Sequence, residues 1–206
     1  MSTPVETVYI VEDDSSFRKS LHRLVHSFGF EPVSFESAES FLQADIRYPG
    51  CLLLDVRLPG IDGLIVQKVL TEKGCLLPVI FMTGHGDIPM SVEAMKKGAV
   101  DFLPKPFRED DLLRAINTAL NRNVHDVRRE REKKEIQALI DTLTPREKEI
   151  LSWVITGKLN KQIAYDLGIT EKTVIVHRSR IMQKTKVSSV AELVRLADKV
   201  NILPAC

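Results

Sequence analysis

The feature that most constrains the fold is an alternation of short apolar runs with helix-patterned segments over the first 120 residues. Between the runs, apolar residues recur at helical spacing, as in Phe17, Leu21 and Leu24. This alternation predicts βαβ crossovers, and therefore a five-stranded parallel sheet with helices on both faces. The predicted strands are residues 8–11, 32–35, 51–54, 78–82 and 100–103.

Chemically reactive side chains follow four of these predicted strands. They are Glu12 and Asp13 after the first, Asp55 after the third, Thr83 after the fourth and Lys105 after the fifth. Because the carboxyl ends of parallel strands meet at one edge of a sheet, we expect these side chains to lie together. Clustered carboxylates favour a cation, and oxygen ligands favour Mg²⁺. The set therefore suits phosphoryl transfer to a carboxylate, although each residue alone could be a helix cap or a surface residue.

Charge divides the chain into two halves. Residues 1–120 hold 12 Lys/Arg and 17 Asp/Glu, whereas residues 121–206 hold 17 and 11. The net charge of +1 therefore hides an acidic half and a basic half. This asymmetry predicts two domains with different partners, and the basic domain is a candidate for nucleic-acid binding. Unevenly distributed solvated charge is the simpler alternative.

The sequence contains no sign of membrane insertion or secretion. No apolar run approaches the roughly 18 residues of a membrane span, and the first seven residues hold neither a basic segment nor an apolar core. Three cysteines are too few for a disulfide framework. We therefore expect a cytoplasmic protein.

A long helix is predicted in the middle of the chain, because residues 107–144 contain no glycine or proline. It would run for about 33 residues, from the last helix of the first domain into a solvated linker. Charged residues fill Arg128–Glu135, with opposite charges four residues apart. A dimeric coiled coil is an alternative, although Asn123 interrupts its apolar seam. A kink near Asn121–Asn123 is a second alternative.

The basic half has the pattern of a helix-turn-helix. Thr144 and Glu147 form a predicted capping box at the start of one helix. Asn160 is predicted to cap a short helix through Leu167, and Thr170 to cap the next, Glu171–Lys184. A last helix follows Ser188 or Ser189, which gives an all-α domain of four helices. Two short helices joined by a tight turn place the second in a DNA major groove.

The second of these short helices has a basic outer face. Residues 171–186 hold five Lys/Arg and one Glu, while Val174 and Ile181 fall on the opposite side. Such a face suits phosphate contact and base reading, although an ordinary solvated helix is the alternative. We expect Lys172, Ile175, Val176 and Ser179 to face base edges. The full predicted set of DNA contacts is Asn160, Lys161, Lys172, Thr173, Ile175, Val176, His177, Arg178, Ser179, Arg180 and Lys184.

The first half resembles the receiver domain of two-component response regulators, a flavodoxin-like (βα)5 fold. The resemblance covers residues 5–121 and rests on the motifs at 11–14, 54–63, 81–86 and 101–107. It implies that Asp55 is the phosphoryl acceptor and that Mg²⁺ is the cofactor. The implied Mg²⁺ ligands are Asp13, Asp55, the backbone carbonyl of Arg57 and, through water, Glu12. The implied switch residues are Thr83, Phe102 and Lys105, with a cis Lys105–Pro106 bond.

The second half resembles the LuxR-type DNA-binding domain, through the motifs at 143–147, 160–164, 167–169 and 173–178. The whole chain resembles the FixJ branch of response regulators (NarL/LuxR-type). This implies a receiver at 5–121, a helical linker at 122–141 and a helix-turn-helix domain at 142–206. The implied partners are a sensor histidine kinase, double-stranded promoter DNA, RNA polymerase and, after phosphorylation, a second copy of the chain. We expect a transcription activator.

An aspartyl-phosphate phosphatase is the competing function for the acidic cluster. Such an enzyme would be expected to carry a second acid two residues after the nucleophile, and here that residue is Arg57. A basic helical domain would also be unexplained. We therefore expect no enzymatic activity beyond Mg²⁺-dependent self-phosphorylation and slow autodephosphorylation.

Overall fold

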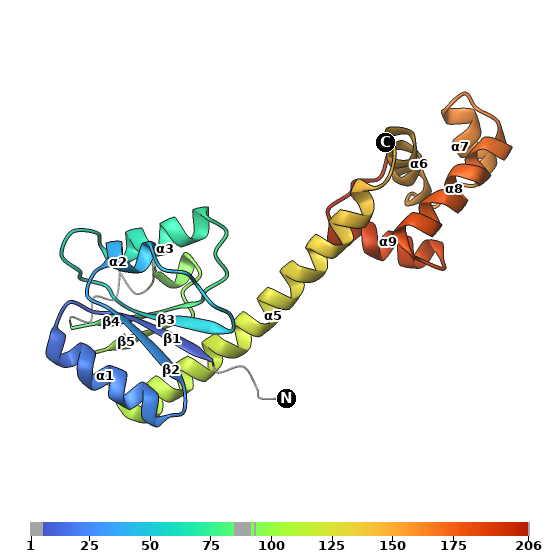
Figure 1. The fold of residues 1–206 in the computed structure, drawn as a ribbon. Coiled ribbons are helices and arrows are strands. Elements are labelled where there is room, and N and C mark those ends of the chain that lie inside the picture. The colour runs from blue at the N-terminus through green and yellow to red at the C-terminus, as the bar shows by residue number, and fades with distance from the viewer. Residues whose placement is uncertain (1–5, 85–91, 93, 206) are drawn as a thin grey trace. The chain divides into compact units, whose positions relative to one another are not determined.

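The computed structural model describes residues 6–84, 92 and 94–205 (Figure 1). The chain divides into two compact units, Met1–Arg128 and Arg129–Cys206. No helix in the described part of the chain is long and apolar enough to cross a membrane.

The first unit is built on a five-stranded parallel sheet, as predicted. Its strands are β1 (Thr7–Val11), β2 (Glu31–Phe35), β3 (Gly50–Asp55), β4 (Val79–Thr83) and β5 (Asp101–Pro104). The strand order is β2-β1-β3-β4-β5, and every neighbouring pair is parallel. The order reverses between β1 and β3, so the carboxyl ends of these two strands flank the crevice where ligands bind in such sheets.

Helices cover both faces of this sheet (Figure 1). They are α1 (Ser15–Ser27), α2 (Ala38–Leu42), α3 (Gly63–Glu72) and the first part of α5 (Glu109–Asp141). Val8 and Ile10 of β1 pack in one cluster with residues of α1 and α5, whereas Tyr9 and Val11 pack in another with residues of α2 and α3. Burial on both faces explains why the strands read as continuous apolar runs. The sequence also predicts a helix after Gly86 that runs through Lys97. It lies partly outside the described residues; within them, Val92 and residues 94–96 are helical.

The long helix α5 has 33 residues, and its helical assignment runs through Asn121–Asn123 without a break. Asn123 is fully buried in the first unit. Its Oδ1 accepts a hydrogen bond from the Gly50 backbone N at 3.0 Å, and its Nδ2 donates to the Leu76 carbonyl at 2.7 Å. Asn123, which interrupts the apolar pattern, is therefore a buried side chain that joins α5 to the start of β3 and to the loop before β4.

The second unit contains four further helices, as predicted. They are α6 (Pro145–Val154), α7 (Asn160–Asp166), α8 (Glu171–Thr185) and α9 (Val190–Lys199). The predicted capping box at the start of α6 is present. Ile136 and Ile140, from the end of α5, are buried in the same core as Val174 and Ile181 of α8. The last turns of α5 are therefore part of the second unit's core.

Asn160 does not cap α7, contrary to the sequence prediction. The N-cap position belongs to Leu159, and Asn160 is the first residue of the helix. The Asn160 Oδ1 accepts a hydrogen bond from Arg178 Nη1 at 2.7 Å. The side chain is thus used between α7 and α8, and the first turn of α7 is closed instead by the Gln162 side chain, which accepts from the Leu159 backbone N.

Candidate functional site

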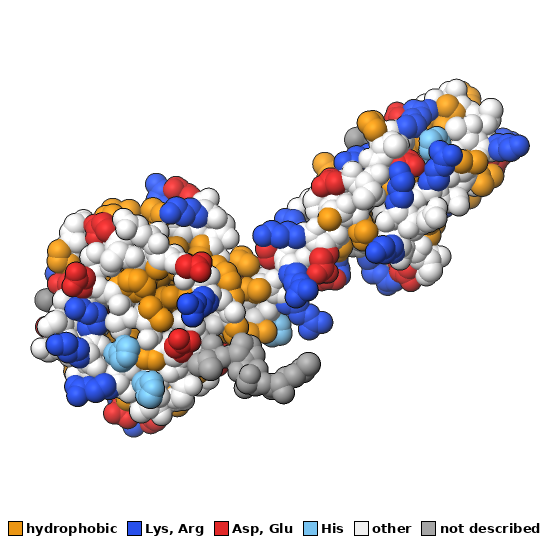
Figure 2. Space-filling view, viewed as in Figure 1, with side chains coloured by type: hydrophobic (Ala, Val, Ile, Leu, Met, Phe, Trp, Pro, Cys, Tyr) orange, Lys and Arg blue, Asp and Glu red, His pale blue; other side chains and the backbone are white. Residues whose placement is uncertain are grey.

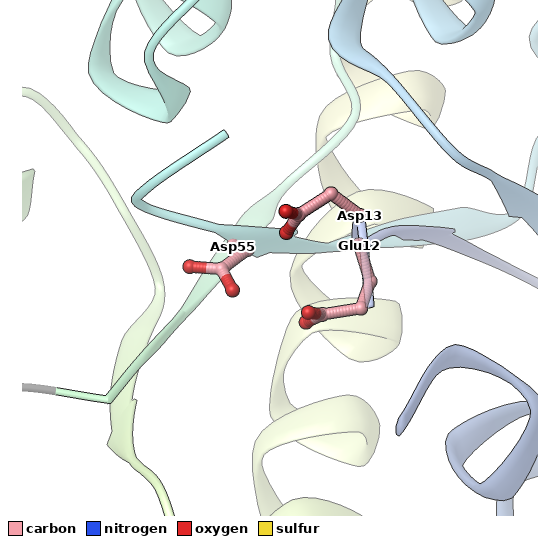
Figure 3. Close-up of side chains that lie close together, drawn as sticks. All are labelled: Glu12, Asp13 and Asp55. Carbon is pink, nitrogen blue, oxygen red and sulfur yellow. The ribbon is translucent and has the colours of Figure 1, made fainter. Parts of the chain in front are cut away.

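Three carboxylates meet at the carboxyl ends of β1 and β3 (Figure 3). Glu12 and Asp13 follow the last residue of β1, and Asp55 is the last residue of β3. One carboxylate oxygen from each of the three lies within 4.8 Å of the others. Glu12 and Asp55 are buried, whereas Asp13 is exposed. The sheet therefore brings together the acidic residues that the sequence predicted to meet.

Lys105 lies against this cluster because β5 ends one residue before it. Its Nζ is 2.6 Å from Glu12 Oε2 and 2.6 Å from Asp55 Oδ2. Its backbone N donates to the Thr83 carbonyl at 2.6 Å, which ties the end of β5 to the end of β4. Thr83 is buried at that strand end. The Lys105–Pro106 bond is cis, as predicted.

The electrostatics of the cluster show a shortage of positive charge. Burial raises the pKa of Glu12, and the hydrogen bond and charge of Lys105 only partly oppose this. Burial lowers the pKa of Lys105, but its hydrogen bonds to Asp55 and Glu12 outweigh burial and leave it above the ordinary value. Lys105 thus pairs with two of the three carboxylates, Glu12 and Asp55. An all-oxygen cluster of this kind can bind a divalent cation.

The backbone around Asp55 orients its carboxylate and allows the start of α3 to lie close to it. The Arg57 backbone N donates to Asp55 Oδ1 at 2.9 Å, which orients the carboxylate. Gly63 begins α3 directly beside it, and a Cβ at that position would lie 2.5 Å from the Asp55 carbonyl oxygen. Any side chain at position 63 would therefore push α3 away from Asp55.

Two residues of α1 complete the surroundings, and the sequence analysis did not identify either as part of the site. Lys105 Nζ lies 4.4 Å from the centre of the Phe17 ring, a cation–π contact. Arg18 donates to the carbonyls of Glu12 and Asp13. The partner of Phe17 is distant in the sequence, and Arg18 bonds to nearby backbone carbonyls rather than to side chains, so neither contact leaves a residue pattern that marks it. Phe102, the predicted aromatic switch residue, is half-buried with its ring centre 6.3 Å from that of Phe81.

The second unit presents the predicted outer face of α8. Val174 and Ile181 are fully buried, while Ile175 and Val176 are 51% and 42% exposed. Figure 2 shows several Lys and Arg side chains on the visible face of this unit. The Thr170 side chain caps α8, as predicted, by accepting from the Thr173 backbone N at 3.1 Å. The exposed members of the predicted contact set are Lys161, Lys172, Ile175, Val176, Ser179 and Arg180.

The other members of that set are held within the unit. Arg178 donates to Asn160, and Thr173 Oγ1 lies 2.8 Å from Thr170 Oγ1. Lys184 Nζ lies 2.7 Å from Glu147 Oε2. His177 is half-buried, and its Nδ1 has no hydrogen-bond partner among residues 6–84, 92 and 94–205. The structure therefore separates exposed side chains from side chains that join the helices.

Comparisons with known proteins agree with both halves. The family model of the response regulator receiver domain matches residues 8–117, and that of bacterial regulatory proteins of the luxR family matches residues 141–197. The chain is 46% identical to response regulator protein TmoT of Ectopseudomonas mendocina, over 98% of this chain and 92% of TmoT. It is 43% identical to transcriptional regulatory protein FixJ of Azorhizobium caulinodans, over 96% of this chain and 94% of FixJ.

A solved structure supports the same assignment. The response regulator StyR matches with a TM-score of 0.79 at 46% identity, over 95% of this chain and 100% of that one. Two family models, two relatives aligned over most of their length and a solved structure therefore agree in assigning a receiver domain to the first unit and a LuxR-type domain to the second. The chain belongs to the transcriptional response regulators of two-component systems, in which a receiver domain precedes a LuxR-type DNA-binding domain.

Proposed function

We propose that Asp55 accepts a phosphoryl group from a sensor histidine kinase, with Mg²⁺ as cofactor. The observation that carries this proposal is the position of Lys105, whose Nζ lies 2.6 Å from both Glu12 and Asp55 at the strand-order switch point. A phosphoryl group on Asp55 would bring further negative charge to a cluster that already shares one ammonium. The three clustered carboxylates, Glu12, Asp13 and Asp55, fit Mg²⁺, because each offers an oxygen ligand.

The proposed roles follow from the place of each residue. Asp13, Asp55 and the Arg57 carbonyl would hold Mg²⁺ directly, and Glu12 would hold it through water. The bound ion would neutralise charge on the phosphoryl oxygens. An Asp55 oxygen attacks phosphorus, the bond from phosphorus to the donor breaks, and the donor leaves with the electron pair. Lys105 and the Thr83 hydroxyl bind phosphoryl oxygens. Phe102 responds to phosphorylation by a change in the packing of its ring.

The same chemistry allows self-phosphorylation from a small phosphodonor and slow autodephosphorylation, with no other enzymatic activity. Dimerisation after phosphorylation would use the segment before Val100 and the strand that follows it. The sequence predicts a face there that contains Val92, Lys96 and Ala99. Val92 is 46% exposed, whereas Ala99 is buried at 4%. The described surface of this face is thus narrower than the sequence indicated.

In the second unit, α8 would enter a DNA major groove. Lys172, Ile175, Val176 and Ser179 would face base edges, of which only the two polar side chains can form hydrogen bonds there. Lys161 and Arg180 are exposed and would contact phosphates. The exposed edge of His177 would add to this surface. We further propose recruitment of RNA polymerase, activation of transcription, and a cytoplasmic location, where promoter DNA lies in bacteria.

We propose domain boundaries within α5, with the receiver at 5–121, a linker at 122–141 and the DNA-binding domain at 142–206. The buried contacts of Asn123 favour extending the receiver slightly beyond residue 121. Those of Ile136 and Ile140 favour extending the DNA-binding domain toward the linker. The linker would then be the short, charged stretch between these anchored turns.

Footprinting with and without a small acyl phosphate tests the whole proposal. The probe is a duplex that the wild-type chain selects from a random-sequence pool. We expect phosphorylation to strengthen protection in the wild type and to leave the Asp55→Asn variant unchanged. Equal strengthening in both chains would contradict phosphorylation of Asp55, and selection of no duplex would contradict DNA binding.

A further inference from the structure

Lys184 joins three parts of the second unit. It lies in the last turn of α8, and its Nζ is 2.7 Å from Glu147 Oε2 in the first turn of α6. The same Nζ donates to the carbonyl of Thr142 at 3.1 Å, just beyond the end of α5. Glu147 Oε2 also accepts from the Thr144 backbone N at 2.8 Å. The ammonium group of Lys184 therefore joins the C-terminal end of α8 to the first turn of α6 and to the residue that follows α5.

We propose that Lys184 is a positioning residue for DNA binding, which holds α8 in place and makes no phosphate contact. The proposal rests on the proposed entry of α8 into the major groove. It reassigns Lys184, which the sequence analysis placed among the predicted DNA contacts.

Burial decides between the two roles. The Glu147 side chain is 2% exposed, and the Lys184 side chain is 34% exposed. If Lys184 turned toward a phosphate, it would leave a buried carboxylate without its cation, which is strongly unfavourable. The hydrogen bond from Lys184 holds the pKa of Glu147 below its ordinary value, so the carboxylate is ionised and needs this partner.

Arg180 can contact a phosphate without leaving a buried carboxylate unpaired. It is exposed on the same helix, and it forms no ion pair or hydrogen bond within the described part of the chain. The middle of α8 is held by Arg178, which donates to Asn160 at 2.7 Å. The contacts of Arg178 and Lys184, six residues apart on α8, therefore fix the orientation of this helix. They thereby set the direction in which its exposed side chains point.

The test compares Lys184→Gln with Arg180→Gln in the full chain, since each removes one positive charge from α8. Binding is measured across a salt series on two probes, the selected duplex and a random duplex. The temperature is set where Trp153 fluorescence shows no unfolded population in either variant; Trp153 is the only tryptophan in the chain.

We expect Arg180→Gln to reduce the slope of log K against log salt by about 0.9 per contacting copy. Lys184→Gln should leave the slope unchanged and weaken binding to the selected duplex by roughly tenfold, while Lys184→Arg restores binding. If Lys184→Gln fails to fold, the double variant Glu147→Gln, Lys184→Met leaves no unpaired buried charge, and it should show the same unchanged slope.

Three results would overturn the proposal. A slope lowered by Lys184→Gln as much as by Arg180→Gln would make Lys184 a phosphate contact. Unchanged affinity and slope in the folded variant would reduce its role to stability alone. Failure of the wild type to bind either duplex would contradict DNA binding itself, and the inference would fall with it. Because the wild-type and Arg180→Gln measurements report DNA binding separately, the two failures are distinguishable.

Discussion

The two units each bury a glutamate beside a lysine, and the two pairs behave in opposite ways. Glu12 and Glu147 are both 2% exposed, and their distances to Lys105 and Lys184 are 2.6 and 2.7 Å. Yet the pKa of Glu12 is raised, with burial as the main cause, whereas that of Glu147 is lowered, with the Lys184 hydrogen bond as the main cause. Equal exposed fractions and similar distances to a lysine therefore accompany pKa shifts of opposite direction.

The difference begins with desolvation, which is the largest influence on the pKa of Glu12, whereas at Glu147 the hydrogen bonds from Lys184 and the Thr144 backbone outweigh it. The two carboxylates also differ in how many donors each has to itself. Glu147 accepts from Lys184 and the Thr144 backbone N, and among the described residues Lys184 forms an ion pair with no other carboxylate. Glu12 shares Lys105 with Asp55, while Asp13 adds a third carboxylate. The first arrangement is complete and holds helices together. The second arrangement has more carboxylates than ammonium groups, and it is therefore suited to bind a cation.

The largest effect should come from breaking the complete pair. Lys184→Met leaves the buried Glu147 carboxylate unpaired, and we expect a loss of about 2–3 kcal/mol in the free energy of unfolding, since Lys184 is partly solvated. Denaturant unfolding followed by Trp153 fluorescence reports this unit. Lys148→Met is the control, because Lys148 is 45% exposed in its pair with Asp141. Equal losses in both variants would contradict the special role of Glu147.

The incomplete cluster should respond to a divalent cation instead. At a Mg²⁺ concentration ten times its dissociation constant, the receiver should gain about 1.4 kcal/mol in calorimetric unfolding. Asp13→Asn should stabilise the receiver in the presence of a chelator, because it removes one of three crowded charges, and should abolish the response to Mg²⁺. A gain from Mg²⁺ that survives Asp13→Asn would place the ion elsewhere.

Acid should weaken the complete pair. Because the pKa of Glu147 is below its ordinary value of 4.5, the ionised carboxylate contributes stability above pH 4.5, and this is lost as pH falls through the lower, folded-state pKa. Glu147→Gln should therefore cost about 1 kcal/mol at pH 7 and progressively less below pH 4.5. Trp153 fluorescence at several pH values measures the difference. A cost independent of pH would show that the carboxylate charge is unimportant.

The smallest effect is expected for an exposed pair of the same chemical type. Arg131 and Glu135 lie 3.0 Å apart on α5, with side chains 81% and 64% exposed. Arg131→Ala should change the free energy of unfolding by less than about 0.5 kcal/mol. A loss above 1 kcal/mol in calorimetry would mean that this linker segment packs against something else.

The sequence predicted the elements whose signals are local. Apolar runs, caps such as Thr144 and Thr170, and the placement of Asp55 and Lys105 at strand ends follow from spacing alone, because parallel strands bring their carboxyl ends together. The capping box and the parallel sheet were predicted for these reasons, and the structure confirms both.

The sequence could not predict which distant groups polar side chains would bond. Asn123 reads as a break in an apolar seam, and it is a buried bridge to Gly50 and Leu76. Asn160 reads as a helix cap, and its side chain accepts from Arg178. Phe17 reads only as a core residue of α1, and its ring faces Lys105. In each case the partner is set by tertiary packing, which leaves no periodic trace.

The central claim is that the incomplete cluster is a phosphorylation site and the complete pair is not. Intact mass after incubation with a small acyl phosphate tests this most directly. Wild type and Glu147→Gln should each gain one phosphoryl group when Mg²⁺ is present and none when it is chelated, while Asp55→Asn should gain none in either condition. An adduct of equal extent on Asp55→Asn, or one indifferent to chelation, would contradict the account.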